Sequence, residues 1–243
     1  MSHPQQRQFI KTISECLSNN FKDRNILEIG SYSVNGSIRQ YFQDSNYYGV
    51  DLTEGPCVDI ICEGDKLDHA DEFYDVTTSC ECFEHNPNWA ETFQNMWRMT
   101  KKGGVVTFTC ATTGRAEHGT TRTSVTDSPG TQLMKWDYYR NLTESDFSTK
   151  FQLNELFSSH FFYVNKNSFD LYFYGVKIGE GHIFGVETSL LETESIEFQK
   201  KLQNEIKNRK KREKFIPRPL RPFFRRLFNS QQQTARQGLV DEY

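Results

Sequence analysis

Long apolar runs are missing from this 243-residue sequence. None of its hydrophobic stretches reaches the roughly 20 residues that a membrane-spanning helix needs. The first seven residues are polar, and no apolar segment of the secretory type follows them. We therefore expect a cytoplasmic protein without a transmembrane helix.

Excess positive charge and closely paired cysteines are missing as well. The formal net charge is -3, which gives no reason to expect that the chain as a whole binds nucleic acid. None of the six cysteines belongs to a C-x-x-C pair, and Cys80 and Cys82 are too close together for a zinc knuckle or a thioredoxin motif. We expect the cysteines to be reduced structural thiols.

A complete dinucleotide fingerprint is the third absence, although the segment that would carry it is present. Residues 25–29 (NILEI) predict a buried strand, followed by a loop with Gly30 and Gly36 and then by a helix. Tyr32 stands where G-x-G-x-x-G needs its second glycine, which argues against NAD. Glu28, near the end of the strand, would repel a pyrophosphate but suits a ligand that carries positive charge.

The next predicted strand also ends in an acid. Residues 47–52 (YYGVDL) place Asp51 near a strand tip, roughly 20 residues after the glycine turn. At this spacing an acid on the following strand reaches the ribose hydroxyls of an adenosine. Alternatively, Asp51 caps a helix, and Gly30 and Gly36 merely form a turn, because short motifs produce false matches.

Three segments in this order resemble the class I S-adenosylmethionine-dependent methyltransferases. They are residues 27–37 (LEIGSYSVNGS), residues 48–52 (YGVDL), and Glu84-His85 ahead of a helix closed by residues 101–104 (KKGG). The resemblance covers most of the chain and implies an α/β fold. This fold is a Rossmann-like, seven-stranded, mostly parallel sheet with an antiparallel terminal hairpin and helices on both faces. The implied cofactor is S-adenosyl-L-methionine, which carries an ammonium and a sulfonium.

The resemblance also implies which residues contact the cofactor. An acid in the loop after the third strand would lie beside the adenine, which makes Asp65 a candidate, although a solvated turn acid fits this position equally well. The implied cofactor-binding residues are Glu28, Gly30, Ser31, Tyr32, Asn35, Gly36, Asp51, Leu52, Asp65 and Cys80.

Hydrophobic periodicity predicts the elements around these motifs. Apolar residues at helical spacing indicate a helix over residues 4–21, and residues 74–79 and 105–111 read as the fourth and fifth strands. Within the resemblance, residues 161–165 and 171–178 form the terminal antiparallel hairpin.

The exit of the fourth strand predicts the acceptor side, because open α/β sheets bind ligands beyond the carboxyl ends of central strands. Asn86 and Pro87 are expected to cap and begin the next helix. His85 is a candidate general base, since a neutral imidazole can take a proton from a hydroxyl near pH 7. The alternative is that His85 hydrogen-bonds Glu84 or the backbone and shapes the loop.

Residues 112–141 form a long polar segment with aromatic residues at one end. Loops of this length inside a compact domain are functional or disordered. Guanidinium groups hold carboxylate or phosphate, and aromatic faces stack on sugars. The acceptor-binding candidates are Arg115, Arg122, Tyr138 and Tyr139. His118 is a second candidate base, unless it is a surface histidine of the loop.

The sequence leaves metal dependence open but does not favour it. The acids near the two histidines are scattered along the chain, whereas magnesium needs carboxylates that converge from several loops. These acids are Glu81, Glu84, Asp127 and Asp137.

The composition changes near residue 190. We expect a methyltransferase domain over residues 1–190 and a basic helical or flexible extension over residues 191–243. Residues 207–228 interleave Lys and Arg with Phe and Leu, which predicts peripheral contact with an anionic membrane surface or an acidic partner. The alternative is a solvated basic helix with a flexible end.

The predicted reaction is methyl transfer to a hydroxyl oxygen of a sugar, polysaccharide or small-molecule acceptor. The rival hypothesis is a non-catalytic scaffold that binds the cofactor and acts through its basic tail. Amino methylation of nucleic acid is disfavoured, because residues 79–82 (SCEC) stand where such enzymes carry an Asn-Pro-Pro-Tyr-type loop.

Overall fold

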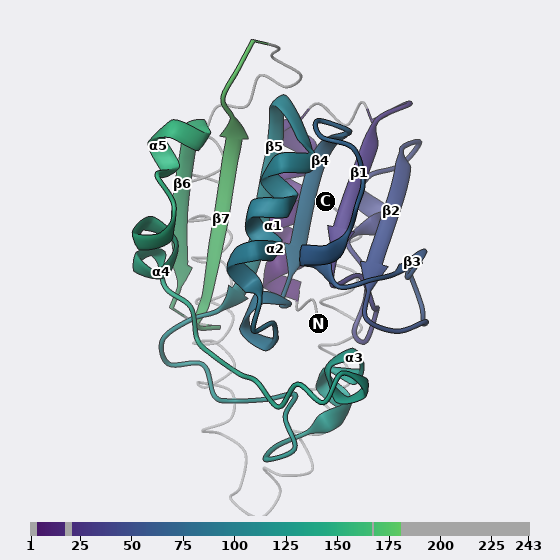
Figure 1. The fold of residues 1–243 in the computed structure, drawn as a ribbon, viewed down its shortest axis with the longest axis vertical. Helices are drawn as coiled ribbons and strands as arrows, with labels where there is room; N and C mark the ends of the chain where they lie inside the picture. The colour runs from purple at the N-terminus through teal and green to yellow at the C-terminus, as the bar shows by residue number, and fades with distance from the viewer. Residues whose placement is uncertain (1–3, 18–20, 167, 181–243) are drawn as a thin grey trace, which may run out of the picture. The chain divides into compact units, whose positions relative to one another are not determined.

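A computed structural model describes residues 4–17, 21–166 and 168–180. Seven strands form one sheet in the order β3-β2-β1-β4-β5-β7-β6 (Figure 1). The strands are β1 (Asn25–Ile29), β2 (Asn46–Asp51), β3 (Ile60–Ile61), β4 (Tyr74–Cys80), β5 (Thr100–Ala111), β6 (Phe157–Asn165) and β7 (Asp170–Lys177). β1 to β5 pair in parallel, and β7 lies antiparallel between β5 and β6. The Rossmann-like fold class predicted from the sequence is confirmed.

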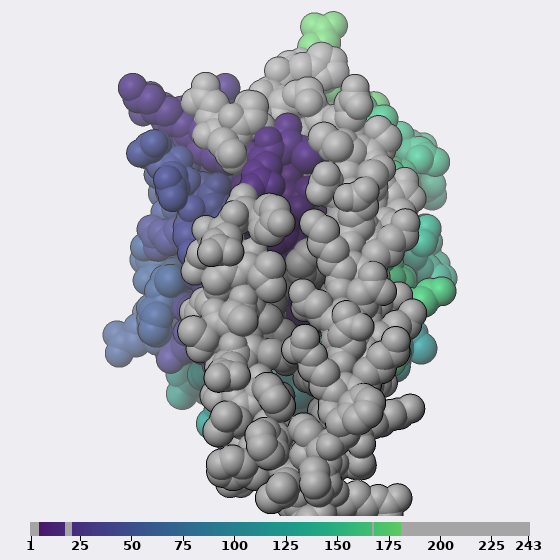
Figure 2. Space-filling model, turned by 180° about the vertical axis from the view of Figure 1, so that it is seen from behind, coloured from purple at the N-terminus to yellow at the C-terminus, as the bar shows by residue number. Residues whose placement is uncertain are grey.

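Helices cover both faces of the sheet because β1 is apolar on both sides. Leu27 packs in the same core as Phe93 of α2, whereas its neighbour Ile26 packs with Ile10 of α1. Figure 1 shows α2 in front of the strands and α1 behind them. Figure 2 shows the opposite side, on which purple atoms from the N-terminal part of the chain lie near the centre, with blue atoms on the left and green atoms on the right. The α-helices are α1 (Pro4–Cys16), α2 (Trp89–Met99), α3 (Pro129–Leu133), α4 (Glu144–Lys150) and α5 (Leu153–Leu156).

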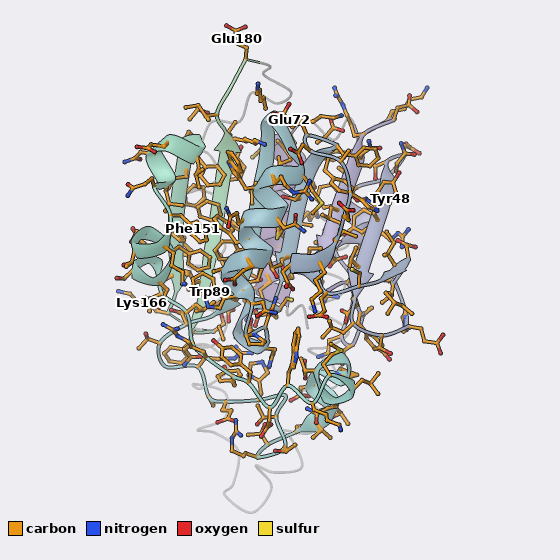
Figure 3. The ribbon with its side chains drawn as sticks, in the orientation of Figure 1. Tyr48, Glu72, Trp89, Phe151, Lys166 and Glu180 are labelled. Carbon is orange, nitrogen blue, oxygen red and sulfur yellow. The ribbon has the colours of Figure 1, made fainter. Side chains whose placement is uncertain are left out.

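Aromatic rings fill the core between α2, α4 and the terminal hairpin. The ring of Phe108 on β5 stacks on Phe147 of α4 and on Phe173 of β7, with centroids 4.6 and 5.1 Å apart. Trp89 and Phe151 lie at the edge of the same group (Figure 3). These rings hold the sheet rigid beneath the loops at its carboxyl edge.

The predicted helix after Gly36 is wrong. One 3-10 turn, η1 (Arg39–Tyr41), stands there instead. Ile38 and Phe42, on either side of it, are both buried in the core, and the chain reaches β2 four residues after Phe42, which leaves no room for a helix. The segment after Gly36 therefore offers no helix N-terminus that could bind an anionic group of a ligand.

Two predicted boundaries of α2 are also wrong. Asn86 and Pro87 precede the helix, and the amide oxygen of Asn86 accepts a hydrogen bond from the backbone N–H of Asn88 at 2.8 Å. Residues 101–104 (KKGG) belong to β5, because Thr100 is already paired with Tyr74 of β4. The extra length of β5 is a tertiary effect of this pairing.

The predicted basic extension, residues 191–243, lies outside the described residues, so its boundary and its proposed membrane or partner contact stay predictions. Among the residues that the structure describes, no helix combines the length and apolar character needed to cross a bilayer.

Candidate functional site

A pocket lies beyond the carboxyl ends of β1, β2 and β4. It holds about 660 Å³ of empty space, part of which is open to solvent. Four of the predicted cofactor residues line it, and so does His85, one of the two predicted bases. The lining residues are Ile29, Gly30, Tyr32, Val34, Val50, Asp51, Leu52, Cys62, Gly64, Glu81, Cys82, His85, Asn86, Asp127, Ser128, Pro129, Gly130, Thr131 and Trp136. The pocket is thus at the edge where an open α/β sheet binds its ligand.

Gly30 joins two walls of this pocket. Its φ is +82°, a left-handed conformation that side chains rarely adopt. A Cβ atom at this position would lie 2.7 Å from the Cβ of Cys82. Glycine is therefore needed for the loop after β1 to pass directly against the loop after β4.

Asp51 faces the pocket from the tip of β2 and fixes the loop after β1. Its carboxylate accepts the backbone N–H of Tyr32 at 2.9 Å and that of Leu52 at 2.7 Å. Burial raises the pKa of Asp51, while these two hydrogen bonds oppose the rise. The carboxylate is thus held at the pocket wall, where the sequence predicts ribose binding.

A short helix closes the pocket above Asp51. Gly130 of α3 lies so near that a Cβ atom there would be 2.9 Å from Oδ1 of Asp51, and Figure 1 shows α3 beyond the ends of β1 and β2. Five further residues of the segment 127–136 line the pocket: Asp127, Ser128, Pro129, Thr131 and Trp136. None of them is a site residue predicted from the sequence, because a five-residue helix inside a polar segment leaves no periodic signal.

Glu28 does not line this pocket. The side chain is 4% exposed, and its Oε2 accepts a hydrogen bond from the hydroxyl of Tyr47 at 2.8 Å. Burial raises the pKa of Glu28 to about 7. The structure therefore places Asp51, but not Glu28, in the pocket, and cofactor binding by Glu28 stays a prediction.

Glu28→Gln is expected to stabilise the cofactor-free protein far more at pH 8 than at pH 5. Between the ordinary pKa and about 7, folded Glu28 keeps a proton that the unfolded chain has lost. The stability of the wild type therefore falls as pH rises through this window. The stability gain of the variant should grow by about 2 to 3 kcal/mol between the two pH values. Urea unfolding at each pH measures it.

The matched control is Glu54→Gln, at an exposed position of the loop after β2. This substitution should change the free energy of unfolding little at either pH. A gain from Glu28→Gln that is equal at pH 5 and pH 8 would show that the buried carboxyl does not titrate as described.

Two further predicted cofactor residues contact α1 instead of the pocket. The guanidinium of Arg7 donates to the backbone oxygen of Asn35 at 3.2 Å. Gly36 has φ +118°, and a Cβ atom there would be 1.9 Å from Nη1 of Arg7. The glycine thus lets the side chain of Arg7 pack against the loop.

The remaining three predicted cofactor residues lie near the pocket without lining it. Ser31 and Cys80 are each 2% exposed. Asp65 follows the pocket-lining Gly64 and accepts a hydrogen bond from the side-chain amide of Asn88 at 3.4 Å. Their cofactor contacts stay predictions.

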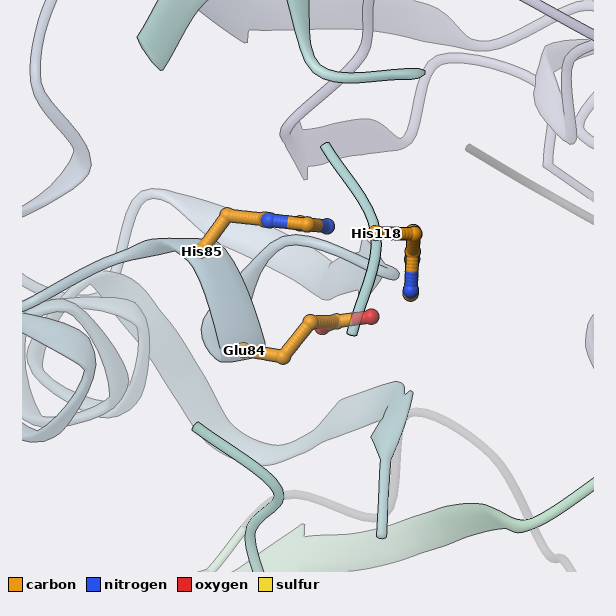
Figure 4. Close-up of side chains that lie close together, drawn as sticks. All are labelled: Glu84, His85 and His118. Atoms are coloured by element: carbon orange, nitrogen blue, oxygen red, sulfur yellow. The ribbon is translucent and has the colours of Figure 1, made fainter. Parts of the chain in front are cut away.

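The two predicted bases lie side by side. The rings of His85 and His118 have centroids 4.8 Å apart, and the ring of Tyr139 packs against both at 5.4 and 5.1 Å. The carboxylate of Glu84 joins them, and one ligand atom from each of the three side chains lies within 4.8 Å of the others. Figure 4 shows that the three side chains converge from the exit of β4 and from the loop after β5.

Burial sets the protonation of this cluster. It lowers the pKa of His85 to about 3, with a further contribution from His118, and it also lowers the pKa of His118. Both imidazoles are therefore neutral at pH 7. Burial raises the pKa of Glu81 well above its ordinary value, and the neighbouring Glu84 raises it further.

Glu81 and Cys82 line the pocket but were missed as site residues. Their position in the sequence could have indicated this, because they directly follow β4 at the carboxyl edge of the sheet, where such sheets bind ligands.

The two arginines among the predicted acceptor-binding residues have different surroundings. Arg122 is exposed and pairs with Glu117 and with Asp137, which the sequence places 15 residues away. Arg115 donates to the backbone oxygen of Ser168 at 2.8 Å and lies 3.4 Å from Asp170.

The two tyrosines also differ. Tyr139 contacts the histidines, whereas Tyr138 lies near Arg140. Tyr139 is therefore the member of the predicted acceptor set that the structure places against the candidate bases.

Solved structures with a similar arrangement of elements come from several organisms. A 1,6-didemethyltoxoflavin N1-methyltransferase of Burkholderia thailandensis, crystallised with S-adenosylhomocysteine, is 16% identical; the match covers 70% of this chain and 79% of that one, with a TM-score of 0.48. The YcgJ protein of Bacillus subtilis is 13% identical, with 70% and 98% covered and a TM-score of 0.46.

A third similar structure is phosphoethanolamine N-methyltransferase 2 of Haemonchus contortus in complex with S-adenosyl-L-methionine. It is 13% identical, and the match covers 69% of this chain but 53% of that one, with a TM-score of 0.47. No curated protein sequence matches this chain.

The family assignment rests on the sequence profile of a methyltransferase domain, which matches residues 1–164. The match includes every strand of the parallel part of the sheet and the pocket at its carboxyl edge. The chain belongs to this methyltransferase-domain family, and its cofactor is S-adenosyl-L-methionine.

Proposed function

We propose that this protein methylates a hydroxyl oxygen of a small-molecule or glycan acceptor. The oxygen attacks the methyl carbon of S-adenosylmethionine in line with the bond from carbon to sulfur, which breaks as the new bond to oxygen forms. S-adenosylhomocysteine leaves, and the proton of the hydroxyl passes to an imidazole. The protein mainly has to hold the two reactants collinear and exclude water.

The position of His85 carries this proposal. His85 lines the pocket from the exit of β4, whereas Gly30 and Asp51 line it from β1 and β2. A cofactor held at the β1 and β2 side would thus present its methyl group toward a wall that contains a proton acceptor. A hydroxyl keeps its proton at neutral pH and benefits from such a group.

The surroundings of His85 support an acceptor with a ring. Tyr139 packs against both histidines and is partly exposed, and aromatic side chains bind the apolar faces of ring compounds. We keep Tyr138, Tyr139 and Arg115 as proposed acceptor contacts. Arg122 would first have to release Glu117 and Asp137 to bind an anionic acceptor.

His85→Ala is expected to lower kcat/KM for a hydroxyl acceptor by about 100-fold, the lower end of the roughly 10²- to 10⁴-fold range of general-base catalysis, because the lowered pKa of His85 keeps the imidazole neutral but makes it a weak base. The assay uses labelled S-adenosylmethionine with glycan, lipid and small-metabolite fractions to find the acceptor, and then the purified acceptor. His160→Ala is the matched control, since His160 lies on β6 and does not line the pocket.

Label found on nitrogen or carbon would contradict the proposed oxygen acceptor. Unchanged kcat/KM in His85→Ala, with unchanged cofactor affinity, would contradict the role of the imidazole. The non-catalytic alternative predicts cofactor binding without transfer of label to any fraction.

A further inference from the structure

We propose that Glu84, His85 and His118 bind a divalent transition-metal ion at the wall of the methyl-transfer pocket. This inference deepens the proposed function and rests on it in one respect: the bound ion would take over activation of the acceptor hydroxyl from the imidazole. No property of the sequence predicts the site, because the three residues are brought together by two separate loops.

The distances suit a metal ion. The three ligand atoms lie within 4.8 Å of one another. Ligands of a tetrahedral ion with bonds of about 2.1 Å lie about 3.4 Å apart. Small side-chain rotations, without movement of the backbone, would bring the three atoms to an ion between them. Two imidazoles and one carboxylate suit zinc and its first-row neighbours better than magnesium or calcium.

The side chains at the exit of β4 have unused binding capacity. Glu84 is 0% exposed, its carboxyl interacts with the neighbouring carboxyl of Glu81, and neither of its oxygens has a partner of full hydrogen-bond geometry among the described residues. His85 is 5% exposed, and its Nδ1 likewise has no such partner. Buried polar atoms without partners are rare, because burial removes the water that would otherwise bind them. Coordination of a cation would satisfy these atoms.

His118 is held in an orientation typical of a metal ligand. Its Nδ1 lies 3.2 Å from the backbone oxygen of Ala116. Donation of a proton from Nδ1 to this carbonyl leaves the lone pair on Nε2 free to bind a metal. The hydroxyl of Tyr139 donates to the same carbonyl at 3.1 Å, so the ring that packs against both histidines is fixed at the same point.

Gly119 allows the second loop to close over the first. Its φ is +68°, and a Cβ atom there would be 2.7 Å from Cε1 of His85. Any larger residue at this position would thus push the loop that carries His118 away from His85. The approach of the two histidines therefore depends on this glycine.

The site would leave coordination positions open toward the pocket. His85 lines the pocket, and an ion with three protein ligands keeps at least one position for water or substrate. A hydroxyl bound there would have a lowered pKa and would lose its proton to water. The resulting alkoxide attacks the methyl carbon, and the electron pair of the broken bond stays on sulfur.

The test is cobalt binding by the full-length chain after treatment with a chelator. Cobalt(II) ions alone are titrated, with visible absorption and equilibrium dialysis as readouts. We expect one cobalt ion per chain and competition by zinc. His118→Ala and Glu84→Gln should each weaken binding by more than about 100-fold, and the control His160→Ala should bind as the wild type does.

His118 is partly exposed, so His118→Ala is expected to fold. It therefore tests the site even if Glu84→Gln, which removes a buried carboxylate, does not fold. Absence of cobalt binding by the wild type, or equal binding by the wild type and His118→Ala, would overturn the inference. The measurement needs no acceptor, so it separates the two proposals. Cobalt binding without transfer to hydroxyls would contradict the proposed function alone, and transfer without metal binding would contradict this inference alone.

Discussion

Asp51→Ala is expected to weaken the binding of S-adenosylmethionine by about 100-fold, which corresponds to about 2.7 kcal/mol. The substitution removes a charged hydrogen-bond acceptor from the pocket wall. It also leaves the N–H groups of Tyr32 and Leu52 without the carboxylate that they now contact at 2.9 and 2.7 Å. Hydrogen bonds to charged groups contribute about 1.5 to 3 kcal/mol each. Titration calorimetry with the purified protein measures the affinity.

Two further variants show whether the loss of cofactor affinity in Asp51→Ala comes from the missing carboxylate. Asp51→Asn keeps an oxygen that can accept from one of the N–H groups, so we expect a smaller loss, of about tenfold. Asp59→Asn is the matched control, because Asp59 also accepts a backbone N–H of β2, that of Gly49 at 2.7 Å, but does not line the pocket. Equal losses in Asp51→Ala and Asp59→Asn would show that the effect comes from disturbance of β2.

Phe108→Ala is expected to destabilise the protein by about 3 to 5 kcal/mol, the usual cost of deleting a buried aromatic ring. Phe108 is 0% exposed and lies at the centre of the aromatic core. It contacts the rings of Phe83, Phe93, Phe147, Phe162 and Phe173. Because these rings come from β6, β7, α2, α4 and the exit of β4, the cavity would loosen several elements together. Chemical unfolding measures the change.

Phe169→Ala is the matched control for this loss. Phe169 is 43% exposed at the turn before β7, and its substitution should cost about 0.5 kcal/mol or less. If Phe108→Ala cost no more than the control, the aromatic rings would not form the tightly packed core seen in the structure.

The central parallel strands β1 and β4 could be predicted from the sequence because both of their faces are buried. Residues 25–29 and 74–80 are short apolar or small-residue runs between polar turns, which is the pattern of a central strand. Asp51 could be predicted from its spacing, because its distance along the chain from the glycine turn follows from the lengths of a strand and of the connection before it.

The helix after Gly36 and the ends of α2 could not be predicted correctly. Their boundaries depend on contacts that are distant in sequence. Thr100 pairs with Tyr74 of β4 instead of extending α2, and the burial of Ile38 and Phe42 confines the chain between them to one turn. Local propensity contains no information about either contact.

The candidate site was predictable at the strand tips and not in the segment after β5. The position of His85 follows from the exit of β4. The contact between His118 and His85 depends on how thirty residues of irregular chain return to the sheet, and Gly119 and Gly130 decide this through close approaches. His118 joins Glu84 and His85 only through this path.

A crystal structure of the protein with S-adenosylhomocysteine tests the central claim most directly. We predict that the ribose hydroxyls lie within hydrogen-bonding distance of the carboxylate of Asp51, with the backbone of Gly30 beside the ligand and the sulfur facing His85. A ligand bound away from Asp51, or with its sulfur turned away from the wall that contains His85, would contradict the account.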